Sequence, residues 1–93
     1  MSPARKNVRV YAAREDQLLT RLARIEGQVR GVARMVDEWR PCIDVLTQIE
    51  AVHGALDTVA LGLLDGHARA CMTTREPADV DELMAAVGRL VRR

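Results

Sequence analysis

The segment from Trp39 to Met72 constrains the fold most, because it predicts one long helix that carries both cysteines of the chain. Pro41 fits the first turn of a helix and disfavours helical geometry in the residue before it, so we place the start of the helix there. The main apolar residues recur at helical spacing. They are Leu46, Ile49, Val52, Leu56, Val59 and Leu63. Smaller apolar residues widen this face, so we expect the helix to be covered on more than one side.

A second helix is predicted over residues 14–38, before the break at Trp39-Arg40-Pro41. Its apolar residues follow alternating steps of four and three, which is typical of a coiled-coil seam. They are Leu18, Leu22, Ile25, Val29, Val32 and Val36. A short third helix follows Pro77, with Asp79 as its expected N-cap. No strand pattern competes, so the sequence predicts an all-α chain of three helices, with the first two forming an antiparallel hairpin.

The composition favours a small protein that gains its core by oligomerising. The 93 residues include one Trp, one Tyr and no Phe, which leaves a single copy with a marginal core. We expect residues 1–13 to form a flexible tail and residues 14–93 a single domain. The chain has neither a signal-peptide pattern nor an apolar run of about 20 residues, so we expect a cytoplasmic protein without membrane contact. Two cysteines there are more typical of metal or redox chemistry than of a disulfide.

Cys42, His67 and Cys71 form the candidate metal site. His67 and Cys71 are four residues apart and share a helix face, whereas Cys42 precedes His67 by 25 residues, or roughly 37 Å of helix. Two antiparallel copies would bring the three together, which suggests a site shared between protomers. Two thiolates and an imidazole suit Cu(I) or Zn(II), and three ligands without a fourth favour trigonal Cu(I). The alternative is a solvated histidine and a merely buried cysteine.

Basic residues are concentrated in the first third of the chain. Residues 1–34 contain eight Lys and Arg against three Asp and Glu, a balance of +5, although the whole chain is only +1. Arg14, Arg21 and Arg24, with Gln28, follow one flank of the apolar seam, and Arg30 and Arg34 lie on the far side. This stripe, without aromatic residues, favours contact with the phosphates of double-stranded DNA. A plain solvated basic face is the alternative.

Catalysis is not indicated by the sequence. It contains no Gly-rich phosphate loop and no evident set of nucleophile, base and orienting residue. We therefore expect a binding protein and not an enzyme.

Four segments of the chain resemble a known family. RLARIEGQVRGVARM (21–35), PCIDVLTQIEAVHGAL (41–56), HARAC (67–71) and DELMAAV (81–87) resemble the copper-sensing CsoR branch of the CsoR/RcnR repressors. The resemblance spans about residues 18–91. It implies a homotetramer built as a dimer of antiparallel dimers, which binds operator DNA without a helix-turn-helix and releases it when Cu(I) binds.

The resemblance also implies roles for individual residues. Cys42 matches the cysteine that one protomer donates to the metal, and His67 and Cys71 match the ligands from the other. Glu82 matches a glutamate beside the metal ligands that couples metal binding to DNA release. The residues that fall in the DNA-binding segment of the family are Arg21, Arg24, Gln28 and Arg30.

One position departs from the family pattern, and it keeps other inducers open. Many copper sensors have a Tyr just before the first cysteine, where this chain has Pro41. Relatives without the histidine sense persulfides, relatives without the second cysteine sense formaldehyde, and a nickel/cobalt branch uses extra N-terminal histidines. His67 argues against the persulfide pattern, and Cys71 argues against the formaldehyde pattern. The absence of a histidine before His53 argues against the nickel/cobalt pattern. The alternatives to a copper-responsive repressor are a persulfide or thiol sensor of the same fold, and a copper-buffering protein without a DNA role.

Overall fold

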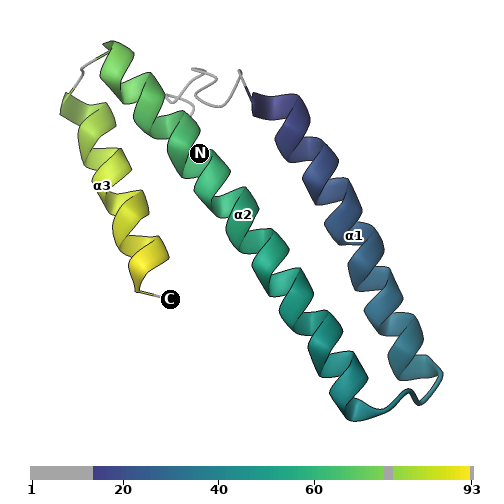
Figure 1. Ribbon diagram of the computed structural model, residues 1–93. Helices are drawn as coiled ribbons and strands as arrows, with labels where there is room; N and C mark the ends of the chain where they lie inside the picture. Colours follow the sequence, from purple (N-terminus) through teal and green to yellow (C-terminus); the bar gives the residue numbers. More distant parts are fainter. Residues whose placement is uncertain (1–13, 75–76, 93) are drawn as a thin grey trace, which may run out of the picture. The chain divides into compact units, whose positions relative to one another are not determined.

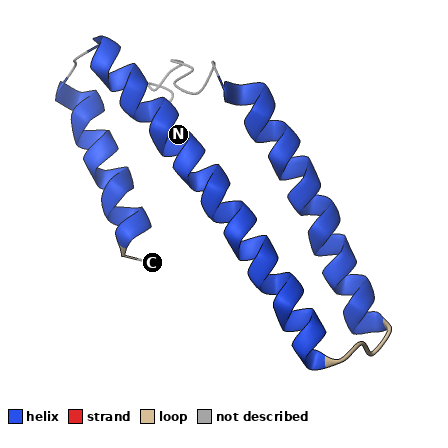
Figure 2. Cartoon of the chain, in the orientation of Figure 1, coloured by secondary structure: helices blue, strands red, loops and turns tan. Residues whose placement is uncertain are grey.

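The computed structural model describes residues 14–74 and 77–92, and these residues form three helices. They are α1 (Glu15–Asp37), α2 (Cys42–Thr74) and α3 (Pro77–Val91), labelled in Figure 1. No strand occurs among the described residues, as Figure 2 shows, which confirms the all-α prediction. The predicted tail, residues 1–13, lies outside the described residues. No helix in the described part of the chain is long and apolar enough to cross a membrane.

The chain divides into two compact units, Asp16–Ala60 and Met1–Glu15 with Leu61–Arg93. In the first, α1 and the beginning of α2 form the predicted antiparallel hairpin (Figure 1). Its buried apolar side chains are Leu18, Ile25, Val52 and Val59. Both pairs are seven residues apart, the spacing at which a helix returns to the same face of a packed seam.

Half of the predicted seam of α1 remains exposed within one copy. Leu22, Val29 and Val36, also seven residues apart, are among the exposed large apolar side chains. A single partner helix covers only a narrow stripe, so the residues on the neighbouring stripe stay in solvent. Leu46 and Leu56 of α2 are likewise exposed within one copy. One copy therefore leaves a large apolar surface unburied.

The loop between α1 and α2 has a tight helix C-cap with an unusual residue in it. Trp39 has a φ of 57° and is the one non-glycine residue with positive φ in the described chain. Its N–H donates to the carbonyl of Val36 (3.1 Å), and the N–H of Arg40 donates to that of Met35 (3.0 Å). This is the Schellman pattern, in which glycine usually takes the left-handed position. A bulky residue there costs roughly 1–2 kcal/mol.

The second unit contains the end of α2 and the whole of α3. α2 begins at Cys42, directly after Pro41, and ends at Thr74, as predicted. The expected N-cap at Asp79 is wrong, because α3 begins two residues earlier, at Pro77. Proline is favoured at the first helical position, where its missing N–H costs no hydrogen bond. Asp79 lies inside the first turn, where its charge still complements the helix dipole.

Candidate functional site

His67 and Cys71 lie one turn apart near the end of α2, and both are buried, with 9% and 5% exposure. The thiol of Cys71 donates a hydrogen bond to the backbone carbonyl of Asp79 at 3.2 Å. This bond joins the last turns of α2 to the first turn of α3. The structure thus brings two of the three predicted ligands together. It also places α3 directly against one of these two residues, Cys71.

The environment of Cys71 favours the protonated thiol. Burial raises the pKa of Cys71, and the negative charges of Asp79 and Glu82 raise it further. Glu82, predicted to act on the site from α3, is therefore near enough for its charge to act on a ligand. Sequence reasoning assigned Asp79 to capping alone and missed its contact with the thiol. The contact depends on how α3 packs on α2, and no sequence pattern encodes it.

Cys42 lies in the first turn of α2 and is exposed. It belongs to the other compact unit, 25 residues before His67 on the same helix. Within the described residues of one copy, no three His, Cys, Asp or Glu side chains gather into a group that could hold a metal ion. The described residues of one copy thus do not form the three-ligand site, and the site shared between two copies stays a prediction from the spacing.

The basic flank of α1 lies open to solvent. Arg21, Arg24 and Gln28 are all exposed. Arg21 and Arg24 line a surface hollow of about 430 Å³, together with Asp16, Gln17 and Thr20. Arg30 projects from another side of the helix and pairs with Glu26 at 3.6 Å, where both side chains are solvent-exposed. An exposed pair of this kind contributes little stability, so Arg30 remains able to contact another anion.

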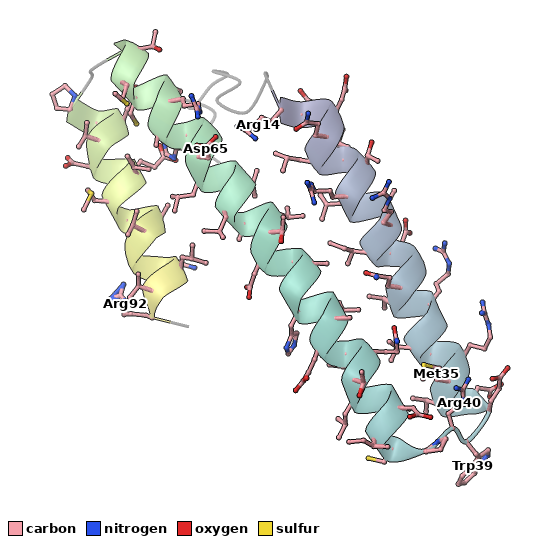
Figure 3. All side chains as sticks on the ribbon, viewed as in Figure 1. Arg14, Met35, Trp39, Arg40, Asp65 and Arg92 are labelled. Atoms are coloured by element: carbon pink, nitrogen blue, oxygen red, sulfur yellow. The ribbon has the colours of Figure 1, made fainter. Side chains whose placement is uncertain are left out.

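An ion-pair cluster joins the start of the basic stripe to the ligand-bearing end of α2. Asp65 Oδ2 lies 3.0 Å from Arg14 Nη2 and accepts a hydrogen bond from Arg69 Nε, also at 3.0 Å. Arg14 and Asp65 are labelled in Figure 3, where their side chains approach one another. Asp65 lies two residues before His67, and Arg69 lies between His67 and Cys71. The spacing of Asp65 and Arg69 indicates their pairing, whereas the contact with Arg14 is long-range and was missed.

A family model described as metal-sensitive transcriptional repressor matches residues 14–89, most of the chain. The chain belongs to this family. Membership fits a small helical chain that has cysteine and histidine near the ends of one helix and a basic flank on another. Proteins of this family are transcriptional repressors and not enzymes. The CsoR/RcnR resemblance inferred from the sequence is confirmed.

Two relatives within the metal-sensitive repressors are named as copper sensors. The copper-sensing transcriptional repressor RicR of Mycobacterium tuberculosis is 50% identical over 90 residues, which cover 88% of this chain and 93% of RicR. The copper-sensing transcriptional repressor CsoR of Bacillus subtilis is 53% identical over 58 residues, or 62% of this chain and 57% of that protein.

A solved structure resembles the fold of this repressor and is named for another metal. The nickel-responsive transcriptional regulator InrS has 46% sequence identity and a TM-score of 0.73, covering 81% of this chain and 90% of that one. These three similar proteins are all named as transcriptional repressors or regulators, although InrS is named for nickel. The two copper-sensing relatives support a copper-responsive repressor.

Proposed function

We propose that this repressor responds to Cu(I), binding operator DNA in its metal-free form and releasing it when Cu(I) binds. The observation that carries the proposal is the ligand set: exposed Cys42 at one end of α2, and buried His67 and Cys71 at the other. Two soft thiolates and one imidazole suit Cu(I), and three ligands complete its trigonal coordination. Ni(II) prefers four or more nitrogen- and oxygen-rich ligands in square or tetragonal geometry.

The site is formed between two copies in the proposed assembly. Cys42 comes from one protomer, and His67 and Cys71 from an antiparallel partner. Support comes from the apolar surface that one copy leaves exposed, including the stripe of Leu22, Val29 and Val36 on α1. A chain of 93 residues with this much unburied apolar surface gains stability by pairing, so we propose a homodimer that assembles further into a homotetramer in the cytoplasm.

The bond from Cys71 to Asp79 offers a route from metal to DNA. A thiolate bound to Cu(I) has no proton to donate, so metal binding removes this link between α2 and α3. The metal-free and metal-bound forms then differ in how α3 is held, and Glu82 on α3 experiences a changed charge at Cys71. A ligand shifts an equilibrium only by its differential affinity, so Cu(I) must bind the form without this link more tightly.

On the DNA side, we propose that Arg21, Arg24, Gln28 and Arg30 of α1 contact the operator. Arg21 and Arg24 are exposed on one flank beside the surface hollow, and their guanidinium groups suit phosphate oxygens. A tetramer repeats this surface four times, which multiplies the number of phosphates neutralised and steepens the dependence on salt.

The experiment that tests this function is anaerobic fluorescence anisotropy of the reduced protein on labelled DNA from upstream of its own gene. We expect a salt-sensitive complex that dissociates near one Cu(I) per protomer and persists with Ni(II). Release by Ni(II) and not by Cu(I) would make the nickel response, named for InrS, the function of this chain. A thiol sensor would ignore both metals and respond to persulfide, and its response would survive His67→Ala. A copper buffer would bind Cu(I) without binding DNA.

The affinity for Cu(I) should rise with pH. Because the pKa of Cys71 is raised in the metal-free protein, this thiol is protonated throughout the neutral range and must lose its proton on binding. Raising the pH therefore favours the metal-bound form until the thiol titrates, and we expect this ligand to contribute about a tenfold gain per pH unit. Competition with a Cu(I) chelator of known pH dependence, from pH 6 to 8, measures the slope. A flat profile would contradict the protonated thiol.

Asp65→Asn should strengthen DNA binding by the metal-free protein. The substitution removes the charge that offsets Arg14, which lies on the same flank as Arg21 and Arg24. The ion pairs of Asp65 are well exposed: the side chains of Arg14 and Asp65 are each about 40% exposed, and that of Arg69 is more so. We therefore expect the substitution to change the free energy of unfolding by less than about 1 kcal/mol. Urea unfolding and anisotropy measure the two effects. Weaker DNA binding would instead mean that Asp65 is needed to orient Arg14.

A further inference from the structure

The loop residue Trp39 combines a strained backbone with an exposed side chain. It is held at positive φ by two hydrogen bonds of the helix cap, and its side chain is 91% exposed. Figure 3 shows Trp39 at the loop between α1 and α2, directed away from both helices. Strained backbone positions of this kind cluster at functional sites. Since glycine would relieve the strain, the indole itself is the feature to be explained.

Two apolar side chains near Trp39 in the sequence are also exposed, and one of them adjoins a proposed metal ligand. Val36 is 61% exposed and Ile43 is 68% exposed, and exposed Cys42 lies next to Ile43 in the first turn of α2. We call Val36, Trp39 and Ile43 the loop patch. Aromatic and aliphatic side chains are typical of the centre of a protein interface.

Exposed apolar side chains also lie at the other end of α2 and on α3, in the other compact unit. Met72 follows the ligand Cys71, and Val80 and Met84 lie on α3 on either side of Glu82. All three are exposed. We call them the methionine patch. Methionine side chains adapt to an aromatic ring, and their sulfur atoms make favourable contacts with it.

We propose that Trp39 of one copy packs against the methionine patch of a second copy and closes the Cu(I) site to water. This inference rests on the proposed function, because the pairing that brings Cys42 to the partner's His67 and Cys71 also carries Trp39, three residues earlier, to that end of the partner. Each dimer then has two equivalent contacts, one at each metal site. Trp39 is a positioning residue: it orders the loop that precedes Cys42 and shields the Cu(I)–thiolate bonds from solvent and chelators.

Trp39 is the only tryptophan in the chain, so its fluorescence reports this contact directly. We expect the emission of the assembled metal-free protein to be shifted to shorter wavelength relative to the urea-unfolded chain, and the shift to disappear on dilution to monomer. Emission like that of the unfolded chain in the assembled protein would overturn the proposal. This readout does not depend on any response to copper.

Two variants of the full chain, Trp39→Gly and Trp39→Phe, test the function of the contact. We expect Trp39→Gly to weaken dimerisation and to accelerate Cu(I) removal by a chelator about tenfold, and Trp39→Phe to recover most of both. Arg40→Ala is the control, since Arg40 lies in the same loop, its side chain makes an exposed 4.0 Å pair with Asp44, and alanine keeps its backbone N–H bond to Met35. It should change neither quantity more than twofold.

If Trp39 makes no contact with a second copy, we expect the opposite outcome. Trp39→Gly would then be more stable than the wild type, with unchanged dimerisation and chelator kinetics, and the inference would be wrong. If the wild type releases DNA on Cu(I) and Trp39→Gly matches it in every respect, the inference alone fails. If the wild type ignores Cu(I), the proposed function fails, and the emission and dimerisation data still decide whether Trp39 packs on a partner.

Discussion

Cys42→Ala protein should bind operator DNA as tightly as the wild type and remain bound when Cu(I) is added. Cys42 is exposed, so its loss removes a metal ligand without opening a cavity in the core. Loss of a group that only orients a metal ligand costs about 10- to 100-fold in metal affinity, and loss of a ligand itself should cost at least as much. Anisotropy titration with Cu(I), run beside chelator competition, measures both the release and the affinity.

The matched control is a substitution of another exposed side chain of the first turn of α2, Asp44→Asn. It should retain release at one Cu(I) per protomer, which would show that the first turn tolerates change at a position that is not a ligand. Normal release by Cys42→Ala at stoichiometric Cu(I) would mean that the metal binds elsewhere. Loss of DNA binding by the metal-free variant would mean that Cys42 serves the fold or the assembly instead.

Replacing both Arg21 and Arg24 with alanine should nearly abolish binding to the operator without altering Cu(I) affinity. Both side chains are exposed and neither has a resolved structural role within the hairpin, so folding should be unaffected. Each phosphate contact contributes about one unit to the slope of log K against log salt, and the oligomer repeats each contact. We expect the affinity to fall by more than about tenfold and the salt slope to become shallower.

Arg34→Ala is the control for this charge removal. Arg34 lies on the same helix, on the side opposite the stripe, so its loss changes the net charge by the same amount per residue. It should leave the salt slope nearly unchanged. An equal loss of affinity in Arg34→Ala would indicate general electrostatic attraction and not a defined contact surface on α1.

The sequence predicts the helices well because strong local signals mark them. The seven-residue spacing of Leu18 and Ile25 indicates the helix α1. Pro41 marks the start of α2 to within one residue. The start of α3 was misplaced because Asp79 resembles an N-cap, while Pro77 is the better first residue of a helix. The left-handed conformation of Trp39 was not predictable, since that position normally takes glycine.

The residues of the candidate site were proposed from the sequence, whereas their surroundings could not be predicted from it. Cys42, His67 and Cys71 stand out because cysteine and histidine are rare in this chain. The contact from Cys71 to the carbonyl of Asp79 involves the backbone, which the sequence does not single out. The pairing of Arg14 with Asp65 joins residues distant in sequence, so it follows from tertiary packing alone. The sequence predicts Leu22, Val29 and Val36 as part of the apolar seam of α1. Which half of that seam is buried in a single copy depends on how α2 packs against α1.

The sharing of the Cu(I) site between two copies is tested most directly by mixing two inactive variants. Cys42→Ala and Cys71→Ala each lack a ligand in every site, but a mixed dimer has one complete site, with Cys42 from one chain and His67 and Cys71 from the other. After joint unfolding and refolding at equal amounts, random pairing makes half of the dimers mixed, which restores about one quarter of the wild-type sites. We predict that chelator competition will detect this quarter. A mixture that binds no more Cu(I) than the separate variants would contradict a site shared between protomers.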